Sequence, residues 1–126
     1  MKPILLPYPV SANRYWRHYK GMTIRSPEAM KFIRDVKLIA AFEKAQKLDG
    51  PVELNIIFHP KLTRRGAASL IRQDLSNTIK VTEDALQGVA FSNDSQVVSL
   101  NACISNPIPG GGLSVDWRSC DDCVHR

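Results

Sequence analysis

Two carboxylates stand at junctions between predicted elements, where a divalent cation could bind. Asp74 lies where a basic loop becomes a helix, and Asp94 lies in "AFSNDSQVV", just before a predicted strand. Magnesium is commonly held by one or two carboxylates, while substrate phosphates and water fill its other positions. Both acids are therefore candidate ligands of Mg²⁺, with Mn²⁺ as an alternative ion. The competing interpretation is that Asp74 caps the helix and Asp94 belongs to a turn.

Lys80 is the candidate for stabilising charge on a phosphate beside those acids. Ser76 and Lys80 are four residues apart and share one face of the predicted helix. A helical side chain leans toward the helix N-terminus, which brings the Lys80 ammonium near the predicted metal. Ser76 stands where a further carboxylate would strengthen the site, and its hydroxyl could hold a metal only weakly or through water. Taken alone, Lys80 would be an ordinary surface lysine.

Glu83 and Asp84 lie further along the same helix and are not expected to replace an acid at position 76. Glu83 is nine residues beyond Asp74, a rise of roughly 13 Å at 1.5 Å per residue. We therefore expect both acids on the solvent-exposed face of the helix.

Two basic segments flank the predicted site and could contact DNA phosphates. The loop 60–73 contains four cations and no acid, and it leads directly into Asp74. The segment 12–25 interleaves cations with aromatic residues, a pattern that suits phosphate contact with base stacking. Its Tyr15 and Trp16 could equally anchor the chain against the sheet. The candidate DNA contacts from both segments are Arg14, Arg17, Lys20, Lys61, Arg64, Arg65 and Arg72.

The composition fits a single soluble domain with a polyanionic partner. The chain has 126 residues, enough for one core, and 44% of them are hydrophobic. A formal net charge of +5 favours nucleic acid, because neutralised phosphates release counterions. No apolar run approaches the roughly 18 residues of a membrane span, and the N-terminus does not resemble a signal peptide. We therefore expect a cytoplasmic protein with no membrane partner.

Two helices are predicted from their end signals and apolar spacing. The first begins after Ser26, a suitable N-cap, with Pro27 at its first position, and Gly50 marks its end. The second runs from about Asp74 to Gln87. Both should pack on a sheet.

Four strands are predicted, at residues 2–8, 51–60, 96–105 and 113–119. The last two are separated by "NPIPGGG", which is rich in turn residues and predicts a C-terminal hairpin. The segment "SANRYWRHYKG" after the first strand is expected to be a polar, aromatic loop. The order β-α-β-α-β-β indicates a small α/β (α+β) domain with a mixed sheet and two packed helices.

Two stretches of this chain, taken together, resemble a known family. "RQDLSNTIKVTEDAL" followed by "AFSNDSQVV" is similar to the core of the RusA Holliday junction resolvases, phage and prophage endonucleases that act as homodimers. The family pattern is a basic residue, D-L-D-N, a lysine four beyond the second Asp, F/D-A-L, and then D-x-Q-V. The opening "LPYPVSANRYWRH" is also similar, so the resemblance covers roughly residues 4 to 118.

The resemblance implies roles for individual residues. Asp74 and Asp94 would be metal-binding acids, Lys80 the essential lysine, and Asn77 a DNA contact within the motif. Ser76 occupies the place of the family's middle aspartate, so metal affinity should be lower than in a site with three acids. The implied activity is Mg²⁺-dependent cutting of four-way DNA junctions by a homodimer, in the recombination and repair of bacterial or phage DNA.

Two alternatives stay open from the sequence. The first is a junction-binding protein of the same fold that has lost catalysis through Ser76. The second is a basic module that binds RNA or a protein partner without catalysis, with its acids serving only as caps and turns.

A single RusA-like nuclease domain is predicted over residues 1–119, followed by a flexible C-terminal tail over 120–126. Cys120 and Cys123 have the spacing of a zinc half-site, with His125 nearby. A second pair of ligands is missing from the sequence, so a mobile terminus is the favoured interpretation.

Overall fold

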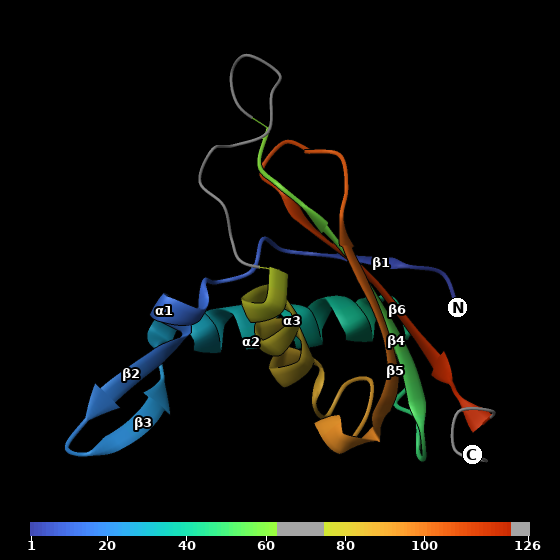
Figure 1. Ribbon diagram of the computed structural model, residues 1–126, viewed down its shortest axis with the longest axis horizontal. Helices are drawn as coiled ribbons and strands as arrows, with labels where there is room; N and C mark the ends of the chain where they lie inside the picture. Colours follow the sequence, from blue (N-terminus) through green and yellow to red (C-terminus); the bar gives the residue numbers. More distant parts are fainter. Residues whose placement is uncertain (63–74, 122–126) are drawn as a thin grey trace.

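A mixed sheet and a separate hairpin make up the strands of the computed structural model, which describes residues 1–62 and 75–121 (Figure 1). The sheet has the strand order β1-β6-β4-β5, and β2 pairs with β3. The strands are β1 (Ile4–Leu6), β2 (Trp16–Tyr19), β3 (Met22–Arg25), β4 (Val52–His59), β5 (Val97–Ile104) and β6 (Gly112–Ser119). The helices are α1 (Ala12–Tyr15), α2 (Pro27–Phe42) and α3 (Leu75–Leu86), and a 3-10 turn, η1 (Asp94–Gln96), precedes β5. The predicted fold class is confirmed.

The central strand β4 divides the sheet into a buried face and an open face. Alternate residues of β4 are buried, as the period of two in a strand requires. On the open face, polar side chains pair across strands: Asn55 donates to Asp116 at 2.8 Å, and Asn101 donates to Asn55 at 2.9 Å. One face thus packs on the core while the other is hydrated, as is common in sheets with antiparallel pairs.

The two C-terminal strands flank β4 instead of pairing with each other. β5 runs parallel to β4, and β6 runs antiparallel to it. Their connection therefore passes over the end of β4, where the Ser105 N–H donates to the Phe58 carbonyl at 2.9 Å. The turn-rich connection predicted that β5 and β6 would pair directly. Turn residues indicate that the chain reverses its direction, but they do not indicate whether another strand lies between the two connected strands.

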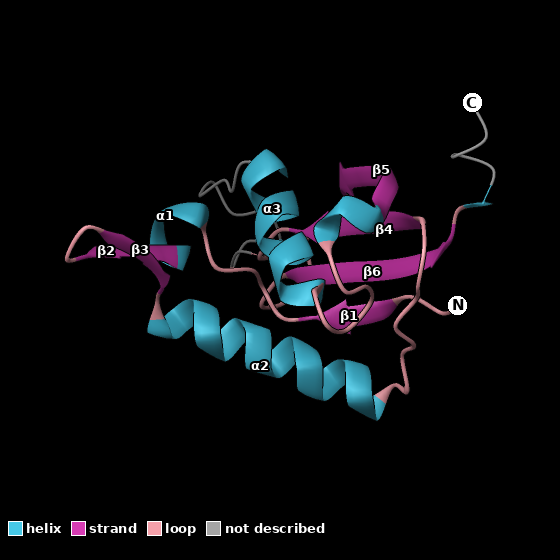
Figure 2. Ribbon diagram, turned by 90° about the horizontal axis from the view of Figure 1, so that it is seen from below, coloured by secondary structure: helices cyan, strands magenta, loops and turns pink. Residues whose placement is uncertain are grey.

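Both long helices cover the same face of the sheet (Figure 2). α2 begins as predicted, because the Ser26 side chain accepts a hydrogen bond from the Ala29 N–H at 3.1 Å and Pro27 follows it. Its buried residues recur at helical spacing on one stripe: Ala29, Phe32, Val36 and Ala40. Within the two described ranges, no helix is long and apolar enough to cross a membrane.

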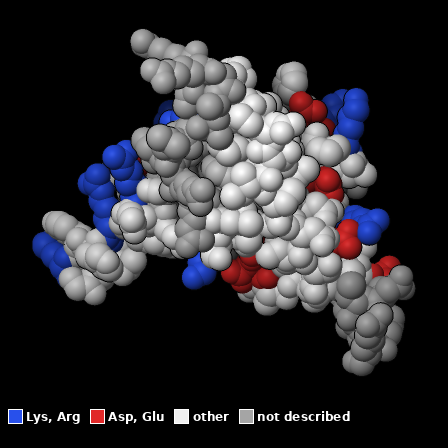
Figure 3. All heavy atoms as spheres, turned by 45° about the horizontal axis from the view of Figure 1, so that its top comes forward, with Lys and Arg blue, Asp and Glu red and all other residues white. Residues whose placement is uncertain are grey.

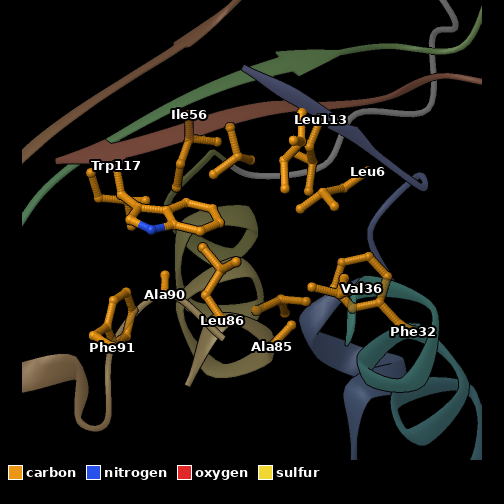
Figure 4. Close-up of a cluster of buried hydrophobic side chains, with 14 of the residues drawn as sticks. Leu6, Phe32, Val36, Ile56, Ala85, Leu86, Ala90, Phe91, Leu113 and Trp117 are labelled. Carbon is orange, nitrogen blue, oxygen red and sulfur yellow. The ribbon is translucent and has the colours of Figure 1, made fainter. Parts of the chain in front are cut away.

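α3 packs against both the sheet and α2, and its buried side chains lie in the core (Figure 4). Ala85 and Leu86 point toward side chains from both neighbours, with Ile56 and Leu113 on the sheet side and Phe32 on the α2 side. Leu86 is fully buried, which contributes about 1.5–3 kcal/mol relative to an exposed leucine. The face of α3 opposite this buried stripe is thereby held in a fixed orientation.

α2 ends earlier than the sequence predicted. Gly50 was expected to mark its end, but the helix stops at Phe42, and Lys44 adopts a positive φ of 56°. The following residues hydrogen-bond to distant elements: the Trp117 indole donates to the Gln46 carbonyl at 2.8 Å, and the Leu48 N–H donates to the Ala90 carbonyl at 2.8 Å. These tertiary bonds replace the helical ones that the local sequence would have allowed.

The segment 11–21, predicted as a polar loop, contains α1, β2 and the turn of the β2–β3 hairpin, which projects away from the sheet at the lower left of Figure 1. Lys20 and Gly21 form its turn, with φ values of 49° and 74°. Two successive positive φ values are the geometry of a tight hairpin turn. The hairpin was not predicted because all eight of its strand residues are exposed. Its strands therefore lack the alternation of apolar and polar residues that marks a half-buried strand.

The start of the predicted C-terminal tail is packed against the domain. Cys120 is buried, and its N–H donates to the Pro51 carbonyl at 2.9 Å. Residues 122–126, including Cys123 and His125, lie outside the described residues.

Candidate active site

A cavity of about 250 Å³ lies against α1, α3 and η1 and is lined by several charged side chains. Lys80 from α3 and Asp94 from η1 both line it, as the sequence predicted. The other lining residues are Ala12, Tyr15, Trp16, Val81, Glu83 and Asp84. The fold thus brings the predicted lysine and one predicted metal-binding acid to the same place.

Asp94 is presented to the cavity by a rigid turn. The Gln96 side chain accepts hydrogen bonds from the N–H groups of Ser92 and Asn93 at 2.8 and 3.0 Å. Its amide donates to the carbonyls of Leu48 and Gly50 at 3.0 and 2.9 Å. Gln96 therefore fixes the backbone under Asp94 while the carboxylate itself stays exposed.

Glu83 lines the same cavity as Asp94, a position that the sequence did not predict. Its side chain is half-buried, and burial raises the pKa of its carboxyl, with the charge of Asp94 as the second cause. The prediction that Glu83 belongs to the solvent-exposed face was wrong. Positions 76, 80 and 83 share one helix face, and packing of the opposite face turns that face toward η1.

Asp84 was also predicted to be solvated, and it is instead the acceptor of a three-donor cluster. Arg25 at the end of β3 donates to it through Nε at 2.9 Å and Nη2 at 2.8 Å. The Tyr15 hydroxyl donates to the same carboxylate. Only 15% of the Asp84 side chain is exposed. We call this cluster of Tyr15, Arg25 and Asp84 the Asp84 clamp.

Tyr15 remains protonated within the clamp. Burial raises the pKa of its hydroxyl far above the ordinary value, and the hydrogen bond to Asp84 and the charge of that carboxylate add to the effect. Of the two roles left open for the aromatic pair, Tyr15 takes the anchoring one, since it is fully buried. Trp16 remains exposed at the rim of the cavity.

Several predicted site residues lie outside the described residues: Asp74, Arg64, Arg65 and Arg72. Two others stand in the first turn of α3, where Ser76 is exposed and Asn77 is half-buried. The structure therefore places Lys80 and Asp94 at one cavity, whereas the catalytic and metal-binding roles of these two residues and of Asp74 stay predictions.

The predicted DNA contacts of the N-terminal segment lie on α1 and the hairpin. Arg14 and Arg17 line a depression of about 380 Å³ next to Trp16, and Arg17 lies 3.6 Å from the Glu28 carboxylate. Lys20 lies in the hairpin turn, with its ammonium 5.4 Å from the centre of the Tyr19 ring. Lys61, beyond the end of β4, lies 4.5 Å from the centre of the Tyr8 ring. These contacts leave the cations on the surface.

The donor chemistry of the cavity suits a hard divalent cation. Asp94 and Glu83 both offer carboxylate oxygens, which magnesium prefers, and no described cysteine or histidine lines the cavity. Among the described residues, no group of three His, Cys, Asp or Glu side chains is arranged to hold a metal. An ion here would therefore need Asp74, substrate oxygens or water to complete its shell.

The cavity combines acids and a lysine with surface cations nearby, which is typical of an enzyme that cleaves nucleic acids. Comparisons with known proteins support this class. The family model described as endodeoxyribonuclease RusA matches residues 7–111. A crossover junction endodeoxyribonuclease of Enterobacteria phage 82 is 35% identical over 114 residues, covering 86% of each chain. Proteins of the same name from Escherichia coli and Shigella sonnei are 33% and 35% identical, again with 86% of each chain covered. The chain therefore belongs to the RusA endodeoxyribonuclease family.

Proposed function

We propose that this protein is a Mg²⁺-dependent endonuclease that cuts four-way DNA junctions, as the names of its relatives describe for them. The observation that carries the proposal is the meeting of Lys80 and Asp94 at one cavity, although they come from separate elements. A lysine beside exposed carboxylates is the arrangement that phosphodiester hydrolysis needs.

Each residue has a defined part in the proposed mechanism. Asp94 and Asp74 would hold the metal ion, with Ser76 as a weak or water-mediated contact and Glu83 as a neighbouring negative charge. When bound, Mg²⁺ supplies polarisation of the phosphodiester and a lower pKa for a coordinated water. Lys80 stabilises the negative charge that grows on the phosphate as the water attacks in line.

Basic surface groups would bind the DNA backbone around this cavity. Arg14 and Arg17 lie next to the cavity wall formed by Trp16, and Lys20 lies in the turn of the hairpin. Phosphate contacts of this kind position the duplex and make binding dependent on salt. A two-fold homodimer would present two cavities to a symmetric junction and cut opposed strands.

A second candidate function is junction binding without cutting. It is favoured by Ser76, which supplies no charge at the position of the family's middle aspartate. The cavity would then hold DNA through its cations while binding the metal too weakly for catalysis.

One experiment separates the two functions. The protein and its Ser76→Asp variant are incubated with labelled four-way junction, with and without Mg²⁺, and paired nicks are measured. Metal-dependent cutting by both proteins supports the endonuclease, and cutting by the variant alone supports the binding protein. Equal affinity for junction and linear duplex, with no effect of Mg²⁺, would contradict both and favour an RNA- or protein-binding module.

A further inference from the structure

The β2–β3 hairpin is attached to α3 at its base. Tyr15 immediately precedes β2 and Arg25 ends β3, and both donate to Asp84 on α3. The Ser26 N–H also donates to the Tyr15 carbonyl at 2.8 Å, which closes the base of the hairpin. Because Arg25 binds the carboxylate through two nitrogens, its orientation is fixed as well as its distance. The hairpin therefore has a defined position relative to Lys80.

The register of the hairpin gives it two different faces. Trp16 pairs with Arg25, and His18 with Thr23, so these four side chains share one face. A contact within that face is consistent with this register, since the Arg25 guanidinium lies 5.9 Å from the centre of the Trp16 ring. Arg17, Tyr19, Met22 and Ile24 share the opposite face. The first face continues into the cavity through Trp16, and the second is open to solvent.

The hairpin and α1 carry only positive charge. Between Ala12 and Arg25 the chain has five Lys, Arg or His residues and no Asp or Glu: Arg14, Arg17, His18, Lys20 and Arg25. Among the described residues, neither Arg14 nor Lys20 forms an ion pair with an acid. On the face drawn in Figure 3, Lys and Arg atoms lie at the left end with few acidic atoms near them, whereas at the right Lys and Arg atoms lie beside acidic ones. A polyanion would be attracted to this end of the molecule.

Exposed aromatic rings stand among these cations. The exposed fractions are 42% for Trp16 and 60% for Tyr19. Burying either ring against the domain would have been favourable, so their exposure on a basic element indicates a ligand with aromatic surfaces. Unpaired bases offer such surfaces, and proteins that bind single-stranded DNA combine stacking rings with a basic groove.

We propose that the β2–β3 hairpin is a rigidly attached arm that binds unpaired or unstacked bases at the branch point of DNA, with Asp84 as the positioning residue that sets the arm relative to Lys80. The proposal rests on the proposed function, since a branched substrate supplies those bases. The Asp84 clamp would then fix the separation between the branch point and the cut.

A second copy of this chain is the competing occupant of the open hairpin face. Its hairpin would bring cations against cations, because no acid lies on this element to pair with them. The charge of the hairpin thus favours DNA over self-association.

Binding to DNA that reports base stacking tests the arm directly. A four-way junction with the fluorescent base 2-aminopurine at its branch point is titrated in EDTA with the protein, Tyr19→Ala and Phe42→Ala. Phe42→Ala is the matched control, because that ring is 84% exposed at the end of α2. We expect Tyr19→Ala to lose the change in fluorescence and to bind the junction about tenfold more weakly. Affinity for linear duplex should change little, and Phe42→Ala should behave as the unaltered protein does.

The role of the Asp84 clamp is tested separately, by substitutions at Asp84 and Arg25. Asp84→Asn keeps Tyr19 in place but removes the charge that orients Arg25. We expect it to reduce the fluorescence change and to speed hydrogen exchange in β2 and β3, while circular dichroism confirms a folded domain. Arg25→Lys, which keeps the charge without the two-nitrogen geometry, should fall between Asp84→Asn and the unaltered protein.

The outcomes separate this inference from the proposed function. If the unaltered protein binds junction and linear duplex equally, the proposed function fails. If it prefers the junction but Tyr19→Ala keeps both the preference and the fluorescence change, the arm alone is disproved. If Tyr19→Ala instead converts a dimer into a monomer in sedimentation, the hairpin is an interface between copies and the inference is overturned.

Discussion

Glu83 and Asp84 are neighbours on α3, yet their carboxylates have opposite electrostatic environments on the two sides of the cavity. On the hairpin side, Asp84 accepts hydrogen bonds from Arg25 and Tyr15, and its charge is neutralised by the guanidinium. On the η1 side, Glu83 lines the same cavity as another carboxylate, Asp94, and none of the ion pairs within the described residues involves either acid.

This difference separates an acid that holds the structure together from acids that remain available to a cation. A carboxylate whose oxygens already accept hydrogen bonds from Arg25, Tyr15 and Gln87 has little capacity left for a metal. Two acids that repel each other gain free energy when a cation arrives between them. The hairpin side should therefore respond to mutation through stability, and the η1 side through catalysis and metal binding.

The largest effect is expected at the η1 side. Asp94→Asn should lower the rate of junction cutting by a factor of about 100 or more, because the proposed metal ligand loses its charge. The melting temperature should change little, since no hydrogen bond within the described residues involves that carboxylate. Gel assays of paired nicks measure the effect, with Asp35→Asn as the control, an acid bound to Lys31 on the exposed surface of α2. Full activity of Asp94→Asn would remove the η1 side from the mechanism.

On the hairpin side, Asp84→Asn should act mainly on stability. It removes the negative charge and replaces one of the two acceptor oxygens with an NH2 donor, so Arg25 and Tyr15 lose part of their hydrogen bonding, which costs about 1–3 kcal/mol of unfolding free energy. Since 42% of the Arg25 side chain is exposed, the loss should fall in the lower part of that range. Urea unfolding gives the value. Arg118→Gln is a matched control, because its ion pair with Glu53 is remote from the cavity and 71% of the Arg118 side chain is exposed, so its effect should be smaller.

Replacing Glu83 should change how the melting temperature depends on pH and on Mg²⁺. The pKa of Glu83 is raised in the folded chain, so the folded state holds this proton more tightly than the unfolded state. The resulting stabilisation is complete below the ordinary glutamate pKa and is lost as the pH rises through the raised one. Metal-free Glu83→Gln should therefore melt at a higher temperature than the unaltered protein at neutral pH. Added Mg²⁺ should raise the melting temperature of the unaltered protein more than that of the variant.

The smallest effect is expected for Tyr15→Phe. The variant keeps the buried ring and removes one of the donors to Asp84, for a loss of about 0.5–1.5 kcal/mol. The bond between Arg25 and Asp84 should persist, and cutting should stay near the original rate. A loss in urea unfolding as large as that of Asp84→Asn would mean that the tyrosine, and not the arginine, dominates the clamp.

Most of the fold could be predicted because its signals are local or periodic. Ser26 and Pro27 start α2, alternate residues of β4 face the core, and the apolar stripe of α3 gives the helix its orientation. The hairpin had only the Lys20–Gly21 turn to mark it, since its strands bury neither face. The end of α2 was set by Trp117 and Ala90, whose distance along the chain hides them from local patterns.

At the site, motif spacing was enough to bring Lys80 and Asp94 together, but not to assign the acids between them. Glu83 and Asp84 look alike in the sequence, and their roles depend on what the tertiary fold places opposite each one. For Asp84 the partner is Arg25, 59 residues away in the chain. The sequence prediction considered only the distance along the helix axis, so it placed both acids in solvent and could not detect Arg25.

The support that Gln96 gives to the turn under Asp94 also bears on how such an enzyme can be switched off. The amide of Gln96 binds four backbone groups, so the turn keeps its shape whatever side chain stands two residues earlier. A chain that lost its acid there would still fold, accumulate in the cell and occupy junctions. Cellular abundance would then be a poor guide to whether a copy of this gene cuts DNA, and an inactive copy would compete with an active one for the same substrate.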